Sequence, residues 1–411
     1  MSSATSADER TWAAERRWEP VLSGLRAEAL DCLQTTMALT ADEAYGTGAH
    51  LALGCRWRFP AGHPRGAVRV QRSLPERMAE ATELLGLRVS QPEGPMGVPE
   101  LRRRLVSAGP LYVVADAYDL RWLPYAARRH MPHSFLLEIG RNGYTVVDAY
   151  HNDTEWGPAR PGVWTLPAAE LDNVVRGGAL AIKLTAAGTQ PPQIDGAAVM
   201  AGNAAAARLA ARDIDSYAAS VRAGLDQPAG FERLVLDIWL LCRERLLHTC
   251  WLGAHPAATA AGAAAHEWQR LAAQSYLALR RAQRGAPCND AIVDDMAQLL
   301  HSDAALVAGL TQAPPPAGNG VAVGEGVTSA VLTALRVTLQ LGDQPIDHSC
   351  ALRSLPRFDS FQLVDIIDRV EVSLGAQMPA DAAADDLADV AGLCRLFARA
   401  VADEEGWSPR R

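Results

Sequence analysis

The sequence contains a single lysine, Lys183, among 411 residues, so arginine supplies nearly all of its positive charge. We attribute this to base composition and draw no function from it. The formal net charge is −8 at pH 7, which argues against nucleic acid as the main partner. The N-terminal stretch carries charges and no long apolar run, which predicts neither a signal peptide nor a membrane span. We therefore expect a cytoplasmic protein with no membrane partner.

The cysteines also lack the spacing that would indicate a structural role. The seven cysteines are widely scattered and no two of them have CxxC spacing. This distribution indicates neither a zinc knuckle nor a disulfide framework. Hydrophobic residues make up 49% of the chain, enough to bury real cores, and the length suggests two to four domains.

The first 190 residues change from helical to strand periodicity. Apolar spacing predicts helices over about 7–39, 76–87 and 98–107, with a turn at 46–48 and a short strand or loop over 51–59. Residues 91–98 hold two prolines and two glycines, which predicts a loop. Apolar runs predict strands over 110–115, 133–139, 144–147, 163–166 and 179–184. This order predicts an α+β domain with an antiparallel sheet over residues 1–190.

Composition divides the rest of the chain. Residues 196–310 have helical spacing and almost no strand signal, which predicts a helical domain. Residues 311–320 contain a run of prolines and then glycines, the clearest linker in the chain. A further small domain is expected over 321–405.

That small domain is centred on Asp359-Ser360-Phe361, which precedes a strongly periodic segment. Its apolar positions share one helical face and its other faces are acidic: Phe361, Val364, Ile367, Val370 and Leu374, against Asp365, Asp368 and Glu371. For an arbitrary serine here, the ordinary interpretation is a helix cap. The stretch instead resembles the attachment site of acyl and peptidyl carrier proteins, in which Asp-Ser-Leu opens an acidic helix.

The resemblance covers about Val321 to Val401, including Met378-Pro379-Ala380-Asp381 and the 387–393 segment. It implies a four-helix-bundle carrier domain with 4'-phosphopantetheine bound covalently to Ser360. The implied partners are a phosphopantetheinyl transferase and an enzyme that loads an acyl group or amino acid.

A second constellation consists of Cys32, His133 and Asp148. Cys32 lies near the start of a predicted helix, where backbone amides lower a thiol pKa. A hairpin with its turn at Asn142-Gly143 brings residue 133 and residues around 150 to the same end, so His133 and Asp148 can touch. A thiol nucleophile needs such a base, and a third group that orients the base. The ordinary alternative for Cys32 is a small buried hydrophobe.

The order Cys, His, Asp is that of papain-like cysteine peptidases. The N-terminal region more closely resembles the carrier-dependent acyltransferase of butirosin biosynthesis. The matching residues include Asp31-Cys32, Gly46 and Gly48, Asp119-Leu120, Leu123-Pro124-Tyr125, His130-Met131-Pro132-His133 and Asp148. The resemblance implies a papain-like α+β fold. Papain-like enzymes usually have a glutamine a few residues before the cysteine, where it helps to form the oxyanion hole. The window LRAEALD before Cys32 contains no glutamine, so the sequence does not identify the oxyanion donors.

Two weaker patterns have alternative interpretations. One pattern resembles a metal cluster of three histidines and two aspartates, namely His130, His133, His151, Asp148 and Asp153. The strand pattern around His133 argues against a bound metal ion. Asp116 and Asp119 are candidates for binding an amine, and equally for a turn.

Together these features predict an acyltransferase of natural-product biosynthesis with Cys32 as its nucleophile. It would move an acyl or aminoacyl group from the phosphopantetheine thioester to a small-molecule amine or alcohol. Two alternatives stay open. One is a hydrolase of thioesterase or peptidase type, and the other is a non-catalytic N-terminal platform fused to a carrier protein.

Overall fold

A computed structural model of the chain describes residues 17–62, 68–90, 93–140, 143–225, 227–253, 255–285, 290–310, 325–339, 341–342, 346, 350–356, 358, 360–379, 387 and 389–406. The chain forms two compact units, Met1–Pro315 and Pro316–Arg411. The predicted linker 311–320 lies outside the described residues. The fold is mixed α+β, which confirms the predicted class at that level. No helix among the described residues is long and apolar enough to cross a membrane.

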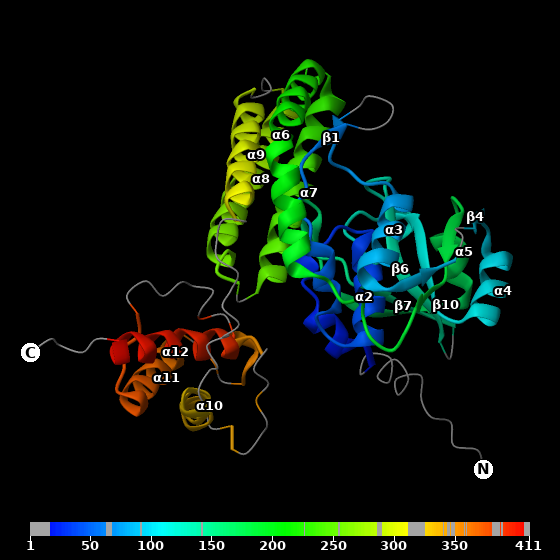
Figure 1. Ribbon diagram of the computed structural model, residues 1–411. Helices are drawn as coiled ribbons and strands as arrows, with labels where there is room; N and C mark the ends of the chain where they lie inside the picture. Colours follow the sequence, from blue (N-terminus) through cyan, green and yellow to red (C-terminus); the bar gives the residue numbers. More distant parts are fainter. Residues whose placement is uncertain are drawn as a thin grey trace, which may run out of the picture. The chain divides into compact units, whose positions relative to one another are not determined.

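A six-stranded antiparallel sheet forms the centre of the first unit (Figure 1). Its strand order is β10-β7-β6-β5-β11-β4. The bounds are β4 (Glu93–Met96), β5 (Leu111–Asp116), β6 (Pro132–Gly140), β7 (Gly143–Asp148), β10 (Gly162–Pro167) and β11 (Ala179–Ile182). Strands β5, β6 and β7 follow the predicted apolar runs, and most side chains of β5 and β6 are buried.

Helices cover both faces of this sheet. Tyr112, Val114 and Leu136 pack in the same core as α2 (Gln34–Tyr45) and α3 (Leu74–Leu85). The alternate positions Val113 and Phe135 face the core shared with α4 (Val98–Ala108) and α5 (Leu171–Val174). Both faces are therefore buried, which explains why β5 is an uninterrupted apolar run.

Local sequence signals set several helix ends. Ser73 and Glu76 form a capping box at the start of α3, and Gly86 ends that helix in the left-handed conformation with φ 63°. Residues 17–24 are helical, and a 3-10 turn, η1 (Ala27–Ala29), follows them. The predicted helix over 7–39 is therefore wrong as one element, because the chain turns between η1 and α2.

Of two other local predictions, the loop over 91–98 is wrong, and the short strand or loop over 51–59 is confirmed only as a loop and only for its second half. Residues 51–59 begin in a 3-10 helix, η2 (Ala49–Gly54), and contain no strand. Residues 91–98 include the edge strand β4, which pairs only with β11. Pro95 is compatible with this position because an edge strand leaves one row of N–H groups unpaired. Three small strand pairs complete the segment: β1 (Ala61–Gly62) with β2 (Val68–Arg69), β3 (Leu87–Val89) with β12 (Leu184–Ala186), and β8 (Asn152–Thr154) with β9 (Gly157–Ala159).

The helical segment of the first unit packs against this α+β segment. It contains α6 (Gly196–Gly224), α7 (Pro228–Leu252), α8 (Ala258–Ala282) and α9 (Ala291–Gly309). Helix α7 contacts both η1 and η2. Near η2 the approach is close, because a Cβ on Gly54 would lie 2.4 Å from the carbonyl oxygen of Leu247. The helices therefore form one wall of the region around Cys32.

In the second unit, the described residues form α10 (Glu325–Leu339), the turn η6 (Leu352–Ser354), α11 (Ser360–Leu374) and α12 (Val390–Gly406). Their core includes Leu335, Leu352, Val370 and Phe397. Among the α11 side chains that are described, Ile366 and Val370 are fully buried, and Ile367 and Leu374 of the predicted apolar face pack against the same core. Asp365 and Asp368 are exposed, as expected.

Candidate functional site

The chain around Cys32 is held by the residue before it. The Asp31 carboxylate accepts hydrogen bonds from the backbone N–H groups of Leu33 (2.9 Å) and Gln34 (2.8 Å), and so caps the start of α2. Its other oxygen accepts from the buried guanidinium of Arg77 at 2.5 Å. Burial opposes the charge of Arg77, but Asp31 and Glu80 outweigh burial and raise its pKa. Cys32 therefore lies at a helix start fixed by a buried ion pair.

His133 and Asp148 lie on neighbouring strands of one hairpin. The register pairs Leu136 with Val147 and Gly140 with Gly143, so residues 141–142, which lie outside the described residues, connect the strands. The predicted turn itself falls on residues that lie outside the described part of the chain, apart from Gly143, which begins β7. Continued along the strands, this register puts Asp148 opposite residue 135, diagonal to His133. Long side chains in that relation come within reach of each other.

The two side chains are in contact. Nε2 of His133 and Oδ2 of Asp148 are 2.7 Å apart, and both residues are fully buried. The indole N–H of Trp122 donates to the same oxygen at 2.9 Å, and the backbone N–H of Tyr150 donates to Oδ1 at 3.0 Å. These contacts orient the carboxylate, which in turn orients the imidazole. Nδ1 of His133 is buried without a hydrogen-bond partner in the described part of the chain.

Cys32 lies beside the strand that carries His133. Its Sγ is 3.6 Å from the carbonyl oxygen of Pro132, the residue before His133. The Ser134 hydroxyl donates to the carbonyl oxygen of Cys32 at 2.5 Å and is 2.9 Å from the Thr36 hydroxyl. The start of α2 is therefore attached to β6 on both sides of His133. The structure brings the three predicted site residues into one region, although no hydrogen bond between Sγ and the imidazole is present among the described atoms.

The surroundings of Cys32 oppose its ionisation. Burial raises the pKa of the thiol, and the nearby negative charges of Asp31 and Asp148 raise it further. Arg243 lowers it, but by less. The backbone at Cys32 lowers the pKa of the thiol, as its position near a helix start predicts, but desolvation and the two carboxylates outweigh that effect. A thiolate at Cys32 is therefore favoured only when a neighbouring base accepts the proton.

We expect the alkylation of Cys32 by iodoacetamide to be slower at pH 7 than that of free N-acetylcysteine. The rate should still be rising with pH above ~8.5, where an ordinary thiol levels off, because only the thiolate reacts and the raised pKa keeps the Cys32 thiol protonated. Peptide mapping after timed alkylation gives the rate at Cys32 alone. A rate that is high and constant from pH 5 to pH 8 would instead indicate a stable thiolate–imidazolium pair.

Arg243 of α7 holds the loop that leads to Cys32. The guanidinium is buried and donates to the carbonyl oxygens of Ala27 (3.0 Å), Leu30 (2.6 Å) and His151 (2.5 Å). It also lies 4.0 Å from the centre of the Trp239 ring. Arg243 therefore joins the helical segment to the segment before Cys32 and to the segment after Asp148.

Other predicted candidates have structural contacts of their own. Asp116 accepts from the backbone N–H groups of Tyr118 and Met131, and its other oxygen is 2.7 Å from Nδ1 of the exposed His130. These contacts fit the turn interpretation of Asp116. No group of three or more His, Cys, Asp or Glu side chains in the described part of the chain is arranged to hold a metal ion.

Ser360 is the first residue of α11. Asp359, which precedes it in the Asp-Ser-Phe motif, lies outside the described residues. The acidic face that follows includes Glu371, whose side chain accepts from the backbone N–H of Met378 at 2.8 Å. Glu371 therefore fixes the chain after α11 and is not a free surface charge.

Sequence reasoning missed several residues of the site. Trp122 lies between residues 119–120 and 123–125, which contribute to the acyltransferase resemblance, so the sequence did point to its neighbourhood. Arg77, Ser134 and Arg243 had none, because their contacts with the Cys32 region arise from tertiary packing. The sequence matches no model of a known protein family, and no curated protein matches it.

Proposed function

We propose that the chain is an acyltransferase in which Cys32 accepts an acyl or aminoacyl group from a phosphopantetheine thioester on Ser360. The observation that carries this proposal is the oriented imidazole. The Nε2 of His133 contacts Asp148, while its Nδ1 is unpartnered next to the strand residue that Cys32 contacts. A papain-like N-terminal domain and a four-helix carrier domain belong to the same proposal.

The chemistry follows from the ionisation of the thiol. The thiol of Cys32 is protonated at rest, so Nδ1 of His133 takes the proton as sulfur attacks the thioester carbonyl carbon. The sulfur–carbon bond to Cys32 forms, and the bond to the pantetheine sulfur breaks. The imidazolium returns the proton to that leaving thiolate. Asp148 stabilises the imidazolium without itself becoming protonated.

The nitrogen or oxygen of an amine or alcohol then attacks the carbonyl carbon of the acyl-enzyme, and His133 takes its proton. The new bond to the acyl carbon forms, the carbon–sulfur bond to Cys32 breaks, and the imidazolium returns the proton to the Cys32 thiolate. Exchange between two thioesters is nearly isoenergetic, so the first step needs no added energy source, and amide formation draws the sequence forward. With water as the acceptor, the same residues would perform the hydrolase reaction. The free acid and the amide product distinguish these two outcomes.

The carrier assignment is tested at Ser360. Incubation of the full chain with a broad-specificity phosphopantetheinyl transferase and coenzyme A is expected to add one phosphopantetheine group, measured by intact mass. Ser360→Ala should prevent the addition, whereas Ser354→Ala, a serine of η6 in the same unit, should leave it unchanged. An unmodified wild-type chain would contradict the carrier assignment and leave Cys32 to be judged separately.

A further inference from the structure

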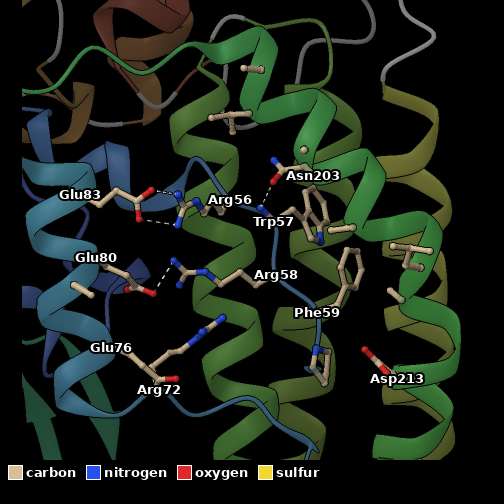
Figure 2. Close-up of a pocket in the computed structure, with 18 residues that line it drawn as sticks. Arg56, Trp57, Arg58, Phe59, Arg72, Glu76, Glu80, Glu83, Asn203 and Asp213 are labelled. Atoms are coloured by element: carbon tan, nitrogen blue, oxygen red, sulfur yellow. Dashed lines mark hydrogen bonds and ion pairs between the residues drawn. The ribbon is translucent and has the colours of Figure 1, made fainter. Parts of the chain in front are cut away.

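The first unit contains a cavity of about 860 Å³ that Cys32, His133 and Asp148 do not line. It lies between α3, the segment 56–60 and the first half of α6 (Figure 2). Buried Asn203 fixes this wall, because its amide donates to the carbonyl oxygen of Cys55 (3.0 Å) and accepts from the backbone N–H of Trp57 (3.1 Å). The cavity is thus a built feature of the unit, separate from the candidate acyltransferase site.

The carboxylates that α3 presents to this cavity are all paired. Glu83 binds Arg56, and Glu80 accepts from Arg58 at 2.7 Å. Glu76 accepts both from Arg69 (2.8 and 2.9 Å) and from the hydroxyl of Ser73 (2.7 Å). Each of these carboxylates therefore already has a direct partner, and Glu76 and Glu80 act on Arg72 only through longer-range electrostatics.

Arg72 is the exception among the charged groups on this side of the cavity. It is half-buried, and the structure gives its guanidinium no hydrogen bond or ion pair with any described residue. In Figure 2 its side chain extends toward Arg58 and carries no dashed line. Burial lowers the pKa of Arg72 and the positive charge of Arg58 lowers it further, while the carboxylates of Glu244 and Glu80 offset these effects only in part. An anion placed here would relieve both the repulsion and the missing contact.

The opposite wall of the cavity is mainly apolar, although Asn203 and Asp213 of α6 also line it. It is formed by the small side chains of α6, including Val199 and Ala206, and by the ring of Phe59. Gly202 lies in this wall, and a Cβ on it would meet nothing within 4 Å. We propose that the cavity binds a small organic anion, with its phosphate or carboxylate group on Arg72 and its apolar part between Phe59 and α6.

Calorimetric titration of the full chain with four probes tests this site. Phenyl phosphate and benzoate carry the anion and the apolar part, inorganic phosphate carries only the anion, and phenol carries only the ring. We expect saturable binding of phenyl phosphate, benzoate or both, tighter than that of inorganic phosphate, and no binding of phenol at the same concentration. The relative affinities of the first two identify the head group. If neither binds at millimolar concentration, the proposal is wrong.

Two variants locate the binding. Arg72→Gln should weaken it by about ten- to a hundredfold, the effect of losing hydrogen bonds from a charged donor. It should not lower the Tm, because an unpaired charge is removed. Gly202→Leu keeps every charge and fills the cavity. It should weaken binding while the helix itself gains stability, since glycine is unfavourable within helices.

Arg270→Gln is the matched control, because Arg270 is an exposed arginine on α8 paired with Glu267. Its affinity for the probes should equal that of the wild-type chain. Binding that survives both Arg72→Gln and Gly202→Leu would place the anion elsewhere and overturn the proposal.

Discussion

Cys32→Ala is expected to abolish acyl transfer from the loaded carrier, and His133→Ala is expected to slow it by ~10²–10⁴-fold. The first variant removes the sulfur that would hold the acyl group. The second removes the base, and the surroundings of the thiol make that loss severe. Because burial and the charges of Asp31 and Asp148 raise the pKa of Cys32, few thiolates form without a proton acceptor.

The measurement follows the acyl group by peptide mass after the carrier is loaded and the acceptor is withheld. In the wild-type chain the group should accumulate on the peptide that contains Cys32. Cys250→Ala and His130→Ala are the matched controls, since Cys250 lies on α7 and His130 is an exposed residue bound to Asp116. Transfer by Cys32→Ala at the wild-type rate would favour the alternative in which the N-terminal region is a non-catalytic platform.

The contact between His133 and Asp148 was predictable because it depends on local sequence. Two apolar runs with a short connection define a hairpin, and a hairpin fixes which residues meet. The paired strands β6 and β7 bring His133 and Asp148 to the same end of the hairpin.

Features that depend on distant partners were not predictable in the same way. The segment 91–98 has the composition of a loop, and β4 forms there only because β11 provides a partner at the edge of the sheet. The pKa of Cys32 likewise depends on burial by packed side chains, which no local pattern reveals. The backbone at the helix start acts on the Cys32 thiol as the local sequence predicts. Burial in the folded chain nevertheless reverses the net direction of the pKa shift.

Arg243→Met is expected to destabilise the first unit by about 2–5 kcal/mol, which urea denaturation would measure. Methionine fills much of the space but donates no hydrogen bond. The carbonyl oxygens of Ala27, Leu30 and His151 would each lose a charged donor. Arg280→Met is the control, because Arg280 is partly exposed and paired with Glu155, so its loss should change stability by no more than about 0.5 kcal/mol.

The same variant tests whether the helical segment controls the nucleophile. Arg243 carries the positive charge that lowers the pKa of Cys32, so its removal should raise that pKa further and move the alkylation profile to higher pH. A loss of stability alone would leave the profile of the remaining folded chains unchanged. If the urea midpoint falls and the pH profile of alkylation does not move, Arg243 only stabilises the fold. If both change, α7 holds the loop before Cys32 and also sets how readily its thiol ionises.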